Sequence, residues 1–399
     1  MFVSVLGGGM VGLANAHIVY DQTRSVVVTA LIAVCGSLPP LMLPAVSTAL
    51  AQRLGGPRTY IARYALSAVV AVVPVVLLTT GHLSTVTLLI WTAAMSAIAG
   101  LFMPSGSLVQ RMLAPPELLP ERTATAGRNA ALAAVIGILG GGVMYETVGA
   151  VWIYAINAIS FIPLVLSVIP LLGNEEPAEA ARHRFGSVWS LLYGPEASLG
   201  LRAACRFTVL SLALGGYTVA LPAIAGTGRG SAGALSLLQA AAVAGGLVTA
   251  VVTHRVHGRV PWGRVQRGCF VVIGVGVLVL AWASRAGMGS AATVLVCMVA
   301  IIPVGLALKL DQTILLALVQ MATPASSRAV FFTYYGLIPM VAVPLGQMAI
   351  GVIADRLSVS IALAAVAALT LALVAIGPRL PMRAAFDELS RAEDPPPVI

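Results

Sequence analysis

The sequence predicts an all-α membrane protein with twelve transmembrane helices in two pseudo-symmetric halves of six. Three observations support this prediction. Of the 399 residues, 59% are hydrophobic and only 9% are charged, whereas soluble domains are about 45–50% apolar and about 25% charged. The apolar residues form runs of the length that a helix needs to cross a bilayer. The basic residues gather in alternate loops between these runs.

Twelve apolar runs follow one another along the chain, joined by short polar segments. Hydropathy and length place the spans at residues 1–20, 26–48, 60–80, 84–113, 123–147, 149–172, 199–222, 231–253, 264–284, 291–321, 327–353 and 358–378. The first run lacks the basic start and the small-residue cleavage site of a signal peptide. We therefore expect it to remain in the protein as a span.

The arginines predict how the spans are oriented. Only four of the 22 arginines fall in the loops after odd-numbered spans: Arg24, Arg229, Arg285 and Arg356. The other 18 lie in the loops after even-numbered spans, at the adjoining helix ends or in the C-terminal tail. Cytoplasmic loops are enriched in basic residues, so both termini should be cytoplasmic. Abundant alanine and arginine are typical of a GC-rich bacterium, so we expect a multi-pass protein of the bacterial cell membrane.

The same composition disfavours several classes of protein. A net charge of +9 could favour the binding of nucleic acid, but the basic residues lie in loops rather than on a surface patch with aromatic residues. The four cysteines (Cys35, Cys205, Cys269 and Cys297) show no paired spacing, so we expect no disulfide framework and no metal site. We expect no cofactor either. No span holds a zinc-binding or nucleophile–base pattern, which leaves a membrane-embedded enzyme as a remote alternative.

Four parts are expected along the chain. They are an N-terminal six-helix bundle (1–172), a cytoplasmic linker with an interfacial helix (173–198), a C-terminal six-helix bundle (199–378) and a cytoplasmic tail (379–399). The two bundles share a short sequence, because Leu-Val-Gln ends at Gln110 in the fourth span and at Gln320 in the tenth, 210 residues later. Two six-helix repeats predict a transporter whose site lies near the bilayer midplane.

Two charged residues fall in the middle of the span at 291–321. Lys309 is the only lysine in the protein, and Asp311 follows two residues later. Val319 marks the expected inner edge of the span, and ten residues of helix rise about 15 Å, half of a hydrocarbon core of about 30 Å. A charge at this depth costs at least about 2.5–3.5 kcal/mol unless it is paired or hydrated, so intramembrane charges indicate a functional site.

Helix geometry separates the two charges onto different faces. At about 100° per residue, Lys309 shares a stripe with Gln312, Thr313 and Gln320, which we expect to face a hydrated cavity. Asp311 points about 200° away, into apolar surroundings. Desolvation there favours the protonated carboxyl, so Asp311 is the expected proton carrier. Its expected neighbours are Val304, Ala307, Leu315 and Leu318. The alternative is that both charges are structural, each paired with a neighbouring helix.

Three local motifs carry a resemblance to a known family. They are Tyr20-Asp21-Gln22-Thr23-Arg24-Ser25 after the first span, Leu38-Pro39-Pro40 in the second, and Glu117-Leu118-Leu119 with Arg128-Asn129 between the fourth and fifth. In order, they are similar to the loop after helix 1, the proline-containing helix 2 and the junction of helices 4 and 5 in the drug and siderophore exporter branch of the major facilitator superfamily, which includes the enterobactin exporter. The resemblance covers nearly the whole chain.

Two superfamily motifs are present in altered form. The loop after helix 2 keeps an arginine and a glycine at Arg53 and Gly55, but Gln52 replaces the aspartate that latches one conformation in the family. The exporter motif of helix 5 keeps its glycines and has Ile138 in place of the proline. These glycines are Gly137, Gly140, Gly141 and Gly142. Glycines let helices approach closely, which suits an interface that rocks during transport.

The resemblance implies that helices 1, 4, 7 and 10 line the substrate cavity. By position, the implied cavity residues are Asn15, His17, Ser105, Ser107, Tyr217, Thr218, Lys309, Gln312 and Thr313. The implied function is proton-coupled export of a hydrophobic or amphiphilic small molecule, such as an antibiotic or siderophore, by alternating access. A proton-coupled importer of a small organic solute is the alternative. The expected partners are the lipid bilayer, the substrate and protons, with the protein a monomer and no nucleic acid bound.

Overall fold

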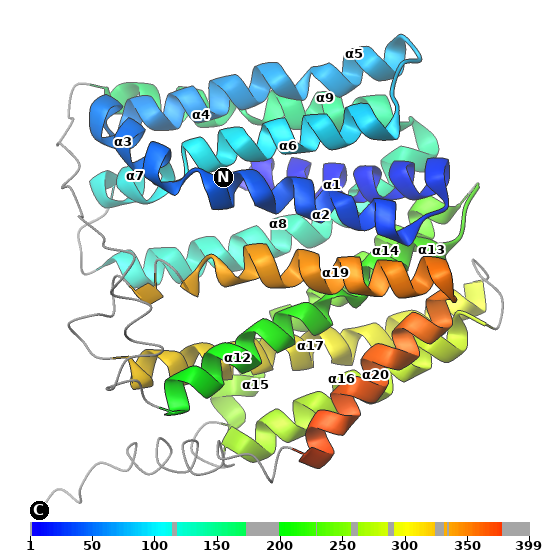
Figure 1. The fold of residues 1–399 in the computed structure, drawn as a ribbon. Coiled ribbons are helices and arrows are strands. Elements are labelled where there is room, and N and C mark those ends of the chain that lie inside the picture. Colours follow the sequence, from blue (N-terminus) through cyan, green and yellow to red (C-terminus); the bar gives the residue numbers. More distant parts are fainter. Residues whose placement is uncertain are drawn as a thin grey trace, which may run out of the picture. The chain divides into compact units, whose positions relative to one another are not determined.

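The computed structural model describes residues 2–113, 118–172, 199–228, 230–256, 262–285, 291–323, 331–332 and 335–376. The predicted linker at 173–198 and the predicted tail at 379–399 lie outside this part of the chain. Within the described ranges the chain is helical and has no strand (Figure 1). The all-α prediction is therefore confirmed.

The first half of the chain contributes α1 (Phe2–Thr23), α2 (Val26–Met42), α3 (Pro44–Leu54), α4 (Gly56–Ala71), α5 (Val73–Thr79), α6 (Thr85–Leu101), α7 (Ser105–Leu113), α8 (Leu119–Thr147), α9 (Ala150–Ser160), α10 (Ile162–Val168) and a short 3₁₀ helix (Ile169–Leu171). The second half contributes α12 (Leu199–Leu214), the 3₁₀ helix η3 (Gly215–Ala220), α13 (Leu221–Ala225), α14 (Ser231–Leu247), α15 (Thr249–Val256), α16 (Trp262–Ala283), α17 (Ala291–Ala322), α19 (Ile338–Arg356) and α20 (Val359–Ile376).

These elements supply twelve apolar segments in the described residues. Eight helices are long and apolar enough to cross a membrane, a bent helix pair makes a ninth, and three shorter apolar helices complete the set. The bent pair is α2 and α3, and the shorter helices are α6, α14 and α20. The twelve segments follow the order of the twelve predicted spans.

Several spans are interrupted where the sequence places proline or glycine. The second span bends by 59° between α2 and α3, where Pro39 and Pro40 lie inside α2 and Pro44 opens α3. Proline removes a backbone donor and clashes with the preceding turn, so it kinks a helix. The seventh span changes to the tighter 3₁₀ form at Gly215–Ala220 before it continues as α13.

The chain divides into two compact units. Unit 1 contains Met1–Ala181 and Leu221–Ala240, and unit 2 contains Arg182–Ala220 and Ala241–Ile399. Residues 221–240, which include α13 and the start of α14, therefore belong with the N-terminal helices by their contacts. The domain limits expected from the sequence remain a prediction.

Unit 1 is held together by a buried cluster around α1 and by close helix contacts. Leu13, Leu88 and Tyr154 are fully buried, and the Trp91 ring meets the Tyr154 ring edge to face at 5.7 Å between centroids. The Trp91 Nε1–H donates to the Val70 carbonyl at 2.9 Å. Lipid is as apolar as these side chains, so close packing and satisfied polar groups stabilise the bundle.

Unit 2 is built around α17, which contacts α12 and α16, while α16 also contacts α20 (Figure 1). A β-carbon added at Gly305 of α17 would overlap the Ala242 carbonyl of α14, and one added at Gly346 of α19 would overlap the Ala213 carbonyl of α12. Glycine is thus required where the backbones of these helices touch. This packing determines which side chains surround the charges of α17.

Candidate functional site on the two faces of helix α17

Lys309 lies on the exposed face of α17. Its Nζ donates to Oε1 of Gln312 at 3.1 Å, and the Thr313 hydroxyl donates to the Lys309 carbonyl at 2.8 Å. Lys309 and Thr313 are exposed, and Gln312 is partly buried. The structure therefore gathers three of the predicted cavity residues on one polar stripe, as their spacing predicts. Their contact with substrate remains a prediction.

A glycine of α14 makes room for the lysine stem. A β-carbon built on Gly246 would lie 2.8 Å from Cγ of Lys309, closer than side chains tolerate. About two turns of α17 earlier, a β-carbon on Gly245 would overlap the Ile302 carbonyl. The Lys309 stem thus lies directly against the backbone of α14, with its ammonium group directed to Gln312. Neither glycine was identified from the sequence, because single glycines are common in spans.

Asp311 lies on the opposite, sealed face of α17. It has no exposed surface, and its predicted neighbours Val304, Ala307, Leu315 and Leu318 are all at most 4% exposed. The two charges are thus separated by the helix itself, as the helical spacing predicts. Asp311 is therefore not accessible from the exposed stripe that carries Lys309 in this conformation.

Two polar side chains from neighbouring helices face Asp311. They are the Ser211 hydroxyl of α12 and the Gln266 amide of α16, which are 0% and 6% exposed. No group in the described part of the chain meets hydrogen-bond geometry with either carboxylate oxygen, and the Ser211 Oγ and Gln266 Nε2 atoms are equally unpaired there. Burying a polar group without a partner is costly, so an unsatisfied cluster of this kind requires an explanation.

The structure does not pair Asp311 with an arginine in the described residues. Arg206 lies on α12, which packs against α17, but its side chain is exposed. The ion pair found in the described ranges joins Arg24 to Asp21 at 3.5 Å, at the C-terminal end of α1. The described residues thus show no ion pair at either charge of α17, and the choice between a functional and a structural role stays a prediction.

The remaining predicted cavity residues are mostly buried in this conformation. Asn15 accepts a hydrogen bond from the Tyr154 hydroxyl at 2.7 Å, and the His17 ring packs edge to face on Tyr145 at 4.7 Å. The Ser105 hydroxyl donates to a carbonyl in its own turn. Asn15, His17, Ser105 and Tyr217 are each at most 6% exposed, and Thr218 is partly buried. The side chain of Ser107 lies outside what the structure describes.

The glycines of α8 contact helices on two sides. A β-carbon at Gly137 would overlap the Leu6 carbonyl of α1, and one at Gly141 would lie 2.9 Å from the Met10 Cα. One at Gly142 would overlap the Ser236 hydroxyl of α14. Gly140 is less confined, with the mobile end of Met10 at 3.3 Å. The motif therefore serves close approach to both α1 and α14, while its role in transport remains a prediction.

The altered motif after the second span lies at the junction of α3 and α4. Gly55 has φ of +76°, a conformation that glycine adopts without strain, and its N–H donates to the Ala51 carbonyl at 3.0 Å. Gln52 and Arg53 are exposed on the last turn of α3. The positive φ at the end of α3 thus explains why glycine occupies position 55. The latching role of Gln52 and Arg53 stays a prediction.

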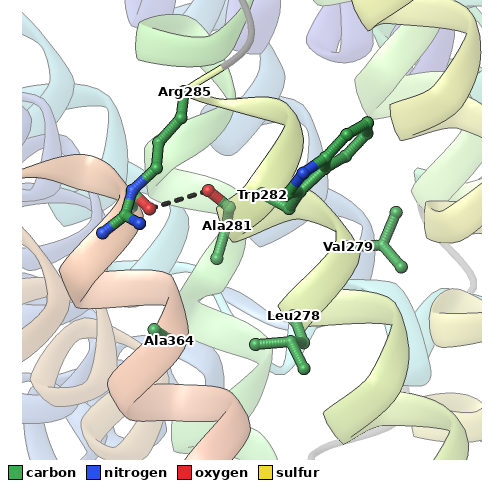
Figure 2. A pocket seen from close by; sticks show the side chains of 7 residues that line it. Leu278, Val279, Ala281, Trp282, Arg285 and Ala364 are labelled. Atoms are coloured by element: carbon green, nitrogen blue, oxygen red, sulfur yellow. Dashed lines mark hydrogen bonds between the residues drawn. The ribbon is translucent and has the colours of Figure 1, made fainter.

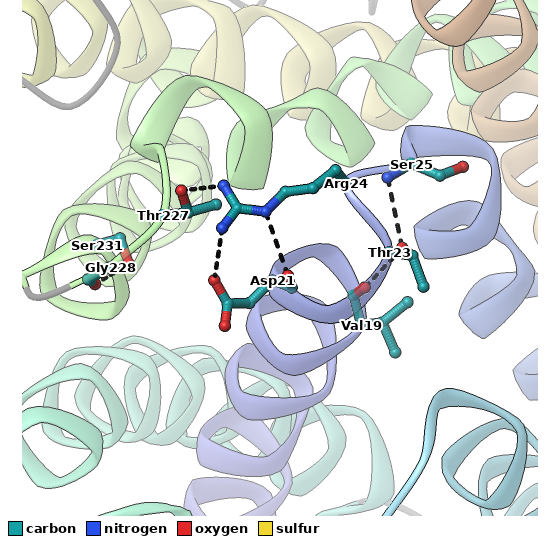
Figure 3. Close-up of polar contacts among 8 residues, drawn as sticks. All are labelled: Val19, Asp21, Thr23, Arg24, Ser25, Thr227, Gly228 and Ser231. Carbon is teal, nitrogen blue, oxygen red and sulfur yellow. Dashed lines mark hydrogen bonds and ion pairs between the residues drawn. The ribbon is translucent and has the colours of Figure 1, made fainter.

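Polar contacts from Arg24 and Glu146 hold Thr227 and the start of α14 to the rest of unit 1. Arg24, at the end of α1, donates to the Thr227 hydroxyl and lies beside Asp21 (Figure 3). The Glu146 carboxylate, in the last turn of α8, accepts from the backbone N–H groups of Gly230 at 3.0 Å, Ala232 at 3.0 Å and Gly233 at 3.4 Å. Glu146 thus caps the N-terminus of α14 from another helix, a contact that no local sequence pattern indicates.

A separate pocket of about 470 Å³ opens between the ends of α16 and α20 (Figure 2). Its lining is apolar apart from Arg285 and Ser360, and the Ser360 hydroxyl already donates to the Ala281 carbonyl at 2.7 Å. Arg285, the last residue of the pocket lining on the α16 side, precedes the start of α17 at Ala291. Lys309 lies 18 residues after Ala291, which is about 27 Å along the helix at 1.5 Å per residue. The pocket is therefore distinct from both faces described above.

The fold of this chain is shared with several solved membrane transporters. The nucleoside transporter NupG superposes with a TM-score of 0.67 at 12% sequence identity, over 96% of this chain and 96% of that chain. A bacterial homologue of the iron transporter ferroportin, in its inward-facing state, gives a TM-score of 0.68 at 16% identity, over 94% of this chain and 95% of the other. A POT family transporter in complex with a thioalcohol-conjugated peptide gives 0.67 at 11% identity, over 95% of each chain.

The chain belongs to the transmembrane secretion effector family, whose sequence profile matches residues 1–399. No curated protein matches the chain. Family and fold are those of a transporter rather than an enzyme, and they confirm the resemblance to the major facilitator superfamily.

Proposed function

We propose that this transporter is a proton-coupled exporter of a hydrophobic or amphiphilic small molecule. The observation that carries the proposal is the separation of two charges on one helix. Lys309 is exposed on a polar stripe, whereas Asp311 is sealed in the packing of unit 2. Two intramembrane charges on separate faces suit two ligands, a substrate on the open face and a proton on the closed one. The family description, a secretion effector, agrees with the outward direction.

The substrate face favours a largely apolar molecule. Along its stripe it offers one ammonium group, one amide and one hydroxyl, from Lys309, Gln312 and Thr313. An antibiotic, a siderophore or a related metabolite with one acidic group fits these donors. The similarity of the loop at Tyr20–Ser25 to the drug and siderophore exporter branch supports this substrate class. In the proposal the chain acts as a monomer in the bacterial cell membrane, with both termini cytoplasmic.

Transport in membrane vesicles tests both direction and coupling. Inside-out vesicles with an acidic lumen should accumulate siderophores, antibiotics or dyes from a panel, in exchange for protons that leave the lumen. Asp311→Asn should abolish this accumulation and retain exchange without a gradient. Asp355→Asn, the same chemical change at the exposed end of α19, is the control and should transport normally. Accumulation only in right-side-out vesicles with an acidic exterior would identify an importer and contradict the proposal.

A further inference from the structure

The polar cluster around Asp311 draws on three helices of unit 2. Asp311 comes from α17, Ser211 from α12 and Gln266 from α16. All three are buried, and in the described residues both carboxylate oxygens, the serine Oγ and the glutamine Nε2 lack a hydrogen-bond partner. Buried polar groups are normally hydrogen-bonded, so three unsatisfied side chains that face one another require an explanation. This arrangement indicates a small ligand that binds among them.

The chemistry of the three groups fits a proton. An ionised carboxylate buried without a partner costs several kcal/mol or more, and such a group takes up a proton instead. A protonated Asp311 has one O–H to donate, and either the Ser211 Oγ or the Gln266 Oε1 can accept it. When the proton leaves, the Ser211 hydroxyl and the Gln266 amide N–H groups can both donate to the carboxylate. Rotation of the hydroxyl and of the amide lets the same two side chains serve both forms.

The other titratable groups near the cluster do not add a charge. In the described residues, Cys269 of α16 and Tyr335 face Asp311 closely enough to interact with it electrostatically. Tyr335 shares a hydrogen bond of 2.9 Å with the Thr208 hydroxyl of α12. A neutral thiol and a neutral phenol do not compensate a carboxylate, so the proton itself is the natural counter-charge.

We propose that Asp311, Ser211 and Gln266 form an occluded proton-binding site that the transported substrate never enters. The inference rests on the proposed function and adds its mechanism of coupling. Substrate contacts the Lys309 stripe, and the proton binds on the opposite face of the same helix. The two ligands therefore do not compete for one group, and their coupling passes through the packing of α17 against α12 and α16. A proton taken from water on one side binds an Asp311 oxygen and leaves to water on the other side when the packing changes.

Infrared spectroscopy of the purified full-length protein in lipid tests the site without transport. A pH titration should show one buried, protonated carboxyl band that Asp311→Asn removes. Ser211→Ala and Gln266→Leu each delete a donor to the carboxylate, so the band should persist to higher pH. Loss of one hydrogen bond to the carboxylate should raise the titration midpoint by about one to two pH units, which is a tenfold to hundredfold increase in proton affinity.

Matched controls lie on the other face of the same helix. Thr313→Ala and Gln312→Leu delete a hydroxyl and an amide from the Lys309 stripe. The titration midpoint of the Asp311 band should then stay within about 0.3 pH units of its value in the unaltered protein, a smaller shift than the loss of one hydrogen bond would cause. A band that survives Asp311→Asn, or a midpoint unchanged in both Ser211→Ala and Gln266→Leu, would overturn the proposal. So would a midpoint that shifts when choline chloride is replaced by sodium chloride, because the site would then hold a metal cation.

Variants that fail to fold do not weaken the test. Aspartate labelled with ¹³C identifies the band in the unaltered protein, and the two partner variants keep the carboxylate. A titrating Asp311 band in a protein that shows no pH-driven efflux would support the proton site and contradict the proposed coupling. Efflux that is driven by pH and retained in Asp311→Asn would contradict the site and leave the exporter function standing.

Discussion

The contact between Glu146 and the start of α14 allows a quantitative test of the packing in unit 1. Gly230, the residue before α14, has no side chain to cap the helix, and Glu146 of α8 accepts from three of the first backbone N–H groups instead. An acidic residue in the last turn of its own helix is unfavourable for the helix dipole, whereas it is favourable at the N-terminus of another. Glu146→Ala removes this cap. Glu146→Gln keeps the shape of the side chain and one acceptor oxygen but removes the negative charge.

The size of the effect follows from the contacts. Loss of a helix cap costs about 0.5–2 kcal/mol, and loss of a charge at a helix N-terminus costs about 0.3–1 kcal/mol. Glu146 is exposed, so solvent screening places the total for Glu146→Ala at about 1–2 kcal/mol. One to two kcal/mol changes a local opening equilibrium by about 5–30-fold. Glu146→Gln should fall between Glu146→Ala and the unaltered protein.

Hydrogen–deuterium exchange of the protein in lipid nanodiscs measures this opening directly. The peptide that covers residues 230–236 should exchange about 5–30-fold faster in Glu146→Ala, and peptides from α17 should not change. Thr147→Ala is the control, because the Thr147 hydroxyl is exposed and donates only to the Val143 carbonyl of its own helix. Equal exchange at residues 230–236 in Glu146→Ala and Thr147→Ala would refute the cap.

Three further predictions concern the glycine motif, the lysine and the topology. Gly141→Leu should abolish transport in vesicle assays while the protein still inserts, because the new side chain meets the α1 backbone. Gly127→Leu on the same helix is the control and should be tolerated, because Gly127 faces open space. Lys309→Ala should weaken efflux of acidic substrates more than of neutral ones, and Lys309→Arg should restore it only in part; equal loss for both kinds of substrate would indicate a structural lysine. Reporters fused after Ile399 and within 173–198 should both read as cytoplasmic, and an external signal from either would contradict the topology.

The order of the spans and the two faces of α17 could be predicted from the sequence because both are local properties. Hydropathy over about twenty residues is enough to identify a span. The angle between Lys309 and Asp311 follows from the rotation of about 100° per residue in any helix. The break at the end of α2 is also local, since Pro39 and Pro40 interrupt the helix wherever it packs.

What surrounds each charge was decided only by the tertiary structure. Ser211 and Gln266 face Asp311 because α12 and α16 pack on one side of α17, and a serine or glutamine in an apolar run carries no sign of that partner. The cap that Glu146 places on α14 joins residues 84 or more apart in the chain. Periodicity shows which residues share a face of a helix, but the helix that covers this face depends on contacts between distant segments.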